Sequence, residues 1–178
     1  LVSNRNDPRV DVITRDYPYD HTFWFQDDAP FSLVSLEEMY FMSAEIALRN
    51  GQIANAQQDL SRAVTLSFDK MEITDHDNYM LSHAQIDTND PLSAQLDSVF
   101  TEKLYALFHS APDILWNDFR RTGFPSVLEN LSPFVTPTNP DYLYPQRSPY
   151  PNSEFTYNQK NVESAISGQG NGTGGLRD

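Results

Sequence analysis

The segment from Ser35 to Lys70 constrains the fold most, because it predicts two consecutive helices joined by a tight turn. Ser35 and Glu38 have the spacing of a capping box, in which both side chains satisfy free backbone N–H groups at a helix start. Asn50-Gly51 is the first helix-breaking pair after them, and apolar residues recur at helical spacing on both sides of it. We therefore predict a helical hairpin made of Ser35–Asn50 and Ile53–Lys70.

Large and small side chains in this hairpin follow the order found in tetratricopeptide (TPR) repeats. Tyr40 and Ala44 take the large and small positions of the first helix, and Ala56 and Leu60 take the alanine and aromatic positions of the second. The alternative is a generic helical hairpin. No second repeat is visible in the sequence, although a stable stack needs roughly three units. Partner helices must therefore come from elsewhere.

The first helix of the hairpin carries two apolar lines. One line is Leu36, Tyr40, Ala44 and Ala47, and the other is Met39, Met42 and Ile46. Two apolar lines predict a helix that packs on two sides. Because this chain offers few partners for the second line, we expect an exposed apolar strip or association with a missing N-terminal part of the protein.

The rest of the chain divides into an irregular start, further helices and a coil-like end. Segment 1–34 is irregular, since prolines at 8, 18 and 30 disfavour helix before them. Helices are predicted over Leu92–His109 and Asp113–Arg120, and a polar loop over Met71–Pro91. Segment 124–178, rich in proline and then glycine, is predicted as ordered coil and tail, with a turn of helix near Asn161–Ser167 at most. The fold class predicted for segments 1–34, 35–123 and 124–178 together is α-dominated, all-α.

Composition excludes several classes of function. A net charge of −13 repels phosphate backbones, so we expect no nucleic-acid partner. The absence of cysteine excludes a disulfide scaffold, a Cys-ligated zinc site and a thiol nucleophile. No run approaches the roughly 18 apolar residues of a membrane-spanning helix.

Neither catalytic residues nor a metal or cofactor site is predicted. Glycoside hydrolysis needs two carboxylates facing a cleft, and the adjacent pairs lie at a helix start or in polar loops: Glu37/Glu38, Asp27/Asp28 and Asp75/Asp77. The four histidines lack zinc-binding spacing. The run from Asp75 to Asn78 is similar to the start of a calcium loop, but it lacks the glycine and the closing glutamate.

Two longer motifs resemble a known family. Phe100–Phe108 followed by Trp116–Pro125 looks like the C-terminal signature of SusD/RagB proteins, and Pro145–Glu154 with Tyr157-Asn158 is similar to that family's Arg-x-Pro-Tyr-Pro-x-x-Glu segment. Asn6–Arg9 and Glu37–Leu48 also fit, in the same order. The chain thus resembles the C-terminal part of the family.

The resemblance implies a TPR-like α-superhelix of the SusD type with a long C-terminal coil, this chain being part of one larger SusD-like domain. It implies an outer-membrane lipoprotein, exposed at the cell surface and lipid-anchored through an N-terminal region absent from this chain. Such a protein captures glycans, both oligosaccharides and polysaccharides, and passes them to a SusC-like TonB-dependent transporter for nutrient uptake. Alternatives are a peptide-binding RagB-like protein, a TPR-type protein-interaction scaffold and a hydrolase.

The motif residues are predicted to be structural. Trp116 and Phe119 share one face of a short helix, while Arg120 and Arg121 cap carbonyls or pair with carboxylates. Tyr142, Tyr144, Tyr150 and Tyr157 are expected to bury their rings and pin the coil onto the helices. The other motif residues assigned a structural role are Gly123, Pro125, Arg147, Pro149 and Glu154.

Ligand contacts are predicted in two loops, because sugar recognition needs flat aromatic faces beside carboxylates or amides. The loops are Tyr17–Trp24 and Asp75–His83. Trp24 and Tyr19 are the first candidates, and the others are Tyr17, Asp20, Asn78 and Tyr79. The alternative for Trp24 is that it fills the core ahead of the first helix together with Phe23 and Phe25.

Overall fold

The computed structural model describes residues 6–9, 12, 28, 32–128 and 150–168. The chain divides into two compact units, Leu1–Pro125 and Ser126–Asp178. The first unit contains α2 (Leu36–Arg49), α3 (Ile53–Lys70), α4 (Asp77–Ser82), α5 (Leu92–Leu107) and α6 (Pro112–Thr122). The second contains the short 3₁₀ helix η3 (Ser126–Leu128), α7 (Asn152–Tyr157) and α8 (Gln159–Gly168). The described residues form helices and no strand, which confirms the all-α prediction.

The predicted hairpin is confirmed at both ends of its first helix. The Ser35 hydroxyl accepts a hydrogen bond of 3.3 Å from the Glu38 N–H, as an N-cap requires. At the other end Gly51 has a φ of +72°, and the N–H groups of Gly51 and Gln52 donate to the carbonyls of Leu48 and Ala47. This is the Schellman arrangement, which turns the chain directly into α3.

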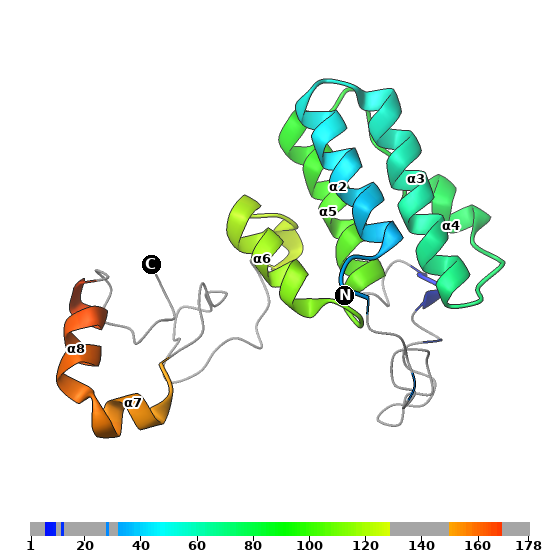
Figure 1. Cartoon of the computed structure of the whole chain (residues 1–178). Helices are drawn as coiled ribbons and strands as arrows, with labels where there is room; N and C mark the ends of the chain where they lie inside the picture. Colours follow the sequence, from blue (N-terminus) through cyan, green and yellow to red (C-terminus); the bar gives the residue numbers. More distant parts are fainter. Residues whose placement is uncertain (1–5, 10–11, 13–27, 29–31, 129–149, 169–178) are drawn as a thin grey trace. The chain divides into compact units, whose positions relative to one another are not determined.

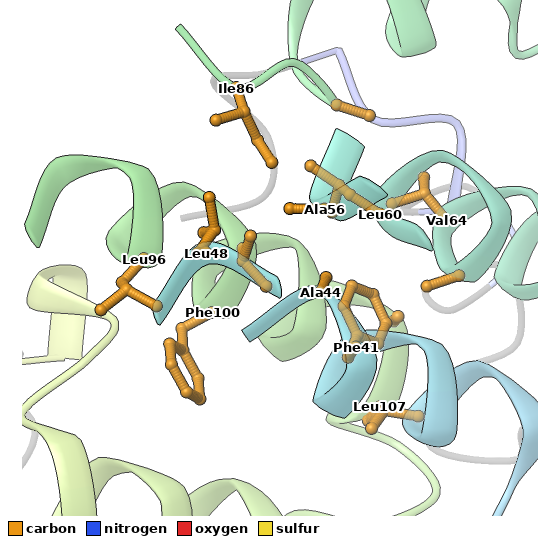
Figure 2. Close-up of a cluster of buried hydrophobic side chains, with 14 of the residues drawn as sticks. Phe41, Ala44, Leu48, Ala56, Leu60, Val64, Ile86, Leu96, Phe100 and Leu107 are labelled. Carbon is orange, nitrogen blue, oxygen red and sulfur yellow. The ribbon is translucent and has the colours of Figure 1, made fainter. Parts of the chain in front are cut away.

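Small side chains let α2 and α3 approach closely. Ala44 on α2, and Ala56 and Ala63 on α3, are fully buried. Helix α5 lies beside the pair (Figure 1). Figure 2 shows the cluster that fills the space between the three helices, with Phe41, Leu48, Leu60, Val64, Leu96, Phe100 and Leu107 among its members.

The second apolar line of α2 is exposed. Ile46 is 60% exposed, and the neighbouring side chains of this line are also open to solvent. We call this surface the apolar strip, and it consists of Leu33, Val34, Leu36, Met39, Met42 and Ile46. The strip confirms the expectation that α2 has more apolar surface than this chain covers.

Two predicted segments differ from the structure. The loop predicted over Met71–Pro91 contains α4, and the coil predicted over 124–178 contains α7 and the whole of α8. The loop prediction is therefore wrong over Asp77–Ser82, and the coil prediction is wrong over Asn152–Tyr157. The turn of helix expected near Asn161–Ser167 is part of the longer helix Gln159–Gly168.

The loop that follows α4 is fixed by Gln57 on α3. The Gln57 Nε2 donates to the Ala84 carbonyl at 2.9 Å, and the Gln57 Oε1 accepts from the Ile86 N–H at 2.7 Å. Ala84 and Ile86 are themselves buried. One side chain thus anchors the extended stretch that leads toward α5.

Candidate functional site

Most of the predicted ligand contacts lie outside the described residues. Trp24, Tyr19, Tyr17 and Asp20 belong to this group. Of the remaining two candidates, Asn78 is exposed on α4, whereas Tyr79 is only 4% exposed. In this structure Tyr79 therefore packs in the helical core and presents no ring face to solvent.

Tyr79 belongs to a buried polar cluster, which we call the Arg9 cluster. Its members are Asp7, Arg9, Ser67, Phe68, Tyr79 and Glu102. The Arg9 guanidinium donates to both Asp7 carboxylate oxygens, at 2.9 Å and 3.1 Å from Nε and at 2.6 Å from Nη2. It also donates to the Ser67 and Tyr79 hydroxyls, each at 3.0 Å, and to Glu102 Oε2 at 3.3 Å.

The Arg9 cluster stabilises the buried positive charge of the guanidinium. Burial alone lowers the pKa of Arg9, but the Asp7 hydrogen bonds and the electrostatic interactions with Tyr79, Asp7 and Glu102 raise it above its ordinary value. Phe68 and Tyr79 add ring faces 4.8 Å and 5.1 Å from the guanidinium carbon. Asn6–Arg9 resembles the family in sequence, but no sequence pattern connects it with Tyr79 or Glu102. Their separation in sequence hides the cluster from any periodic pattern.

Helix α6 carries the first family motif and is tied to α2 and α5 by charge pairs. Arg121 donates to Glu45 from two nitrogens, Nη1 to Oε1 at 2.8 Å and Nη2 to Oε2 at 2.7 Å. Arg121 also pairs with Asp118 on its own helix, and Asp118 pairs with Lys103 on α5. The hydrogen bonds from Arg121, with a smaller contribution from Arg49, lower the pKa of Glu45 against the opposing effect of burial.

The rest of this motif also takes structural positions in the first unit. Trp116 is half-buried with the Arg120 guanidinium 4.9 Å from its ring, while Phe119 is buried. Gly123 ends α6 with a φ of +74°, and its N–H donates to the Phe119 carbonyl. Pro125, which follows a cis peptide bond, is buried.

The second family motif is described only in part. Arg147, Pro149, Tyr142 and Tyr144 lie outside the described residues. Tyr150 and Glu154 are half-buried, and the Glu154 carboxylate accepts a hydrogen bond of 3.0 Å from the Asn158 amide. Tyr157 is 89% exposed, so the expectation that its ring is buried is wrong.

Several carboxylates of the described residues make structural contacts. Asp7 and Glu102 both contact the Arg9 Nη2, but both are buried and neutralised in part by that cation. Glu37 pairs with Lys70 at 2.7 Å, and Glu38 lies in the first turn of α2. Within the part of the chain that is described, no group of three or more His, Asp or Glu side chains is placed to hold a metal ion.

Comparison with known proteins gives one match. A family model whose description is starch binding in association with the outer membrane matches residues 3–151. The chain belongs to the SusD-like family. No curated protein and no solved structure matches the chain significantly.

Membership confirms the resemblance seen in the two motifs and gives the chain its general function. SusD-like proteins are binding proteins, and the family is associated with carbohydrate binding at the outer membrane. Among the helices that are described, none has the length and apolar character needed to cross a bilayer.

Proposed function

We propose that this SusD-like chain is part of a cell-surface protein that captures glycans without cleaving them and passes them to a SusC-like TonB-dependent transporter. The observation that carries the proposal is the family match over residues 3–151. A buried setting for Asp7 and Glu102 also supports binding over hydrolysis, because neither carboxylate is open to a glycosidic bond in this structure. We further propose that a lipid attached N-terminal to this chain anchors the protein in the outer membrane.

Starch is the first ligand to test, since the family description names it. We expect the chain to be retarded in a native gel that contains amylopectin and to release no reducing ends from it. Retardation with release of reducing sugar would establish the hydrolase alternative. Binding of proteins or peptides but of no saccharide would instead establish the scaffold or the RagB-like alternative.

We propose Trp24 and Tyr19 as the main ligand contacts, with Tyr17, Asp20 and Asn78 beside them. The Trp24→Ala and Tyr19→Ala variants should lose retention while their thermal unfolding stays close to that of the wild type. Tyr157→Ala is the matched control, because Tyr157 is an exposed tyrosine outside the proposed set. Unchanged retention, or retention lost together with folding, would remove these residues from the proposal.

We also propose that the N-terminal remainder of the same protein covers the apolar strip. The strip lies on α2, the first helix of the hairpin, and on the two residues Leu33 and Val34 ahead of it, and a TPR-like stack buries such a face against a neighbouring unit. In a chain extended at its N-terminus, the strip should therefore bind less hydrophobic dye than in the 178-residue chain. Equal dye binding by the two chains would contradict this.

A further inference from the structure

The Arg9 cluster has two parts with different origins. Arg9 and Asp7 belong to the short described stretch Asn6–Arg9, whereas the groups around the guanidinium come from three helices. Ser67 and Phe68 lie on α3, Tyr79 lies on α4 and Glu102 lies on α5. In Figure 1 the dark-blue stretch, Asn6–Arg9, lies beside the end of α3, and Arg9 contacts Ser67 on α3 and Tyr79 on α4.

The helical part of the cluster suits a planar cation. Ser67 Oγ, Tyr79 Oη and Glu102 Oε2 accept hydrogen bonds from the two terminal nitrogens of Arg9. The Phe68 and Tyr79 rings lie beside the guanidinium carbon. A guanidinium presents flat faces to rings and several fixed N–H donors at its edge, whereas an ammonium presents a compact point charge.

The helical acceptors are themselves held in place. The Tyr79 hydroxyl donates to Glu102 at 2.9 Å, and the Ser67 hydroxyl donates to the Val64 carbonyl at 2.7 Å. Phe68 packs edge-on against Tyr79 and stacks on His76. These contacts are made among the helices and the residue before α4, and none of them involves an Arg9 atom.

We propose that α3, α4 and α5 form a binding site for a guanidinium group, and that Arg9 occupies this site from within the same chain. Arg9 is fully buried there, and Asp7 enters with it as a counter-ion. Filling the site fixes the stretch Asn6–Arg9 on the helical core. The site does not rest on the proposed function.

Chemical rescue of the full chain tests the site. Arg9→Ala vacates the guanidinium position and should lower the melting temperature. Ethylguanidinium at tens of millimolar, far below denaturing concentrations, should then raise the melting temperature of this variant by about 3 °C or more by binding only the folded state. Ethylammonium and sodium chloride at the same concentrations should not, and the wild type should show no rise.

Two further variants make the test specific. Adding Glu102→Gln to Arg9→Ala should reduce the rescue, since the carboxylate that faces the guanidinium is then neutral. Arg62→Ala is the matched control, because Arg62 is an exposed arginine whose guanidinium carbon lies 5.7 Å from the Tyr40 ring. It should melt close to the wild type, and ethylguanidinium should not stabilise it.

If Arg9→Ala does not fold, the same comparison is made by circular dichroism during refolding. Ethylguanidinium should then restore helical signal at concentrations at which ethylammonium does not. Equal effects of the two cations, or no effect of either, would overturn the proposal and leave Arg9 as an ordinary buried ion pair.

Discussion

Arg121 and Glu45 lie 76 residues apart in sequence, yet they face each other through two parallel hydrogen bonds. The pair joins α6 to α2, and Asp118 extends it to Lys103 on α5. A planar fork that meets a carboxylate at both oxygens fixes orientation as well as distance. The part of the family motif on α6 thus connects this helix to α2 and to α5.

Replacing Arg121 with alanine should destabilise the first unit. Arg121 is 52% exposed, which weakens its charge pairing, but its loss leaves Glu45 with Arg49 as its remaining cationic partner. We expect a loss of about 1–2 kcal/mol in the free energy of unfolding, measured with urea. Arg120→Ala is the control, since Arg120 contacts the Trp116 ring and should cost less. Equal losses for the two variants would contradict the connector role.

Acid should remove the contribution of Glu45 to stability. Its pKa is lowered in the folded state from the ordinary value of 4.5, chiefly by Arg121, so the contribution is complete above about pH 4.5. It disappears as the pH falls through the lower folded value. The stability difference between wild type and Glu45→Gln should therefore be largest near pH 7 and shrink toward pH 3. A constant difference over this range would rule out the explanation.

Trp116 and Phe119 should differ in importance although both belong to the motif. Phe119 is buried, and Phe119→Ala should cost about 3 kcal/mol or more. Trp116 is half-buried under Arg120, and Trp116→Ala should cost less than that. Urea unfolding of both variants measures the order. A larger loss at Trp116 would show that its ring is the main anchor of α6.

The helices with strong local signals are those that the sequence predicts. Ser35 marks the start of α2 with its side-chain cap and Gly51 marks the end with its positive φ, and α3 has the bounds expected from its apolar spacing. Helix α4 has only six residues and no side-chain cap, so its position depends on contacts made by Tyr79 with distant residues. Local patterns cannot reveal a helix of this kind.

The Arg9 cluster escaped prediction for the same reason. Arg9 lies 58 residues from Ser67, 70 from Tyr79 and 93 from Glu102. A buried cation produces no periodic pattern of apolar residues in the sequence. Pro8 also led to the prediction of an irregular segment around Arg9. Pairing of an arginine with carboxylates at the end of α6 was expected from the sequence, and Arg121 makes such pairs, whereas the Arg120 guanidinium lies over the Trp116 ring.

Substitution by glutamate should be tolerated on the apolar strip and not in the core. Met39→Glu and Ile46→Glu should leave helix content and melting temperature near the wild-type values, because both side chains are more than half exposed. They should reduce dye binding and self-association of the chain. Ala44→Glu on the same helix is the contrast, since Ala44 is fully buried and a charge there should prevent folding. Unfolding of Ile46→Glu would contradict the exposure of the strip.

The Gln57 side-chain amide takes the place of a backbone peptide group. Its amide donates to the carbonyl of Ala84 and accepts from the N–H of Ile86, which is the pair of bonds that a neighbouring strand would make. The helical core thereby satisfies backbone groups of the buried residues Ala84 and Ile86 with a side chain in place of a strand. The segment is also held in register, since a shift by one residue would break both bonds together. The path from α4 to α5 is thus fixed from α3, by one amide that lies about thirty residues upstream of the stretch that it holds.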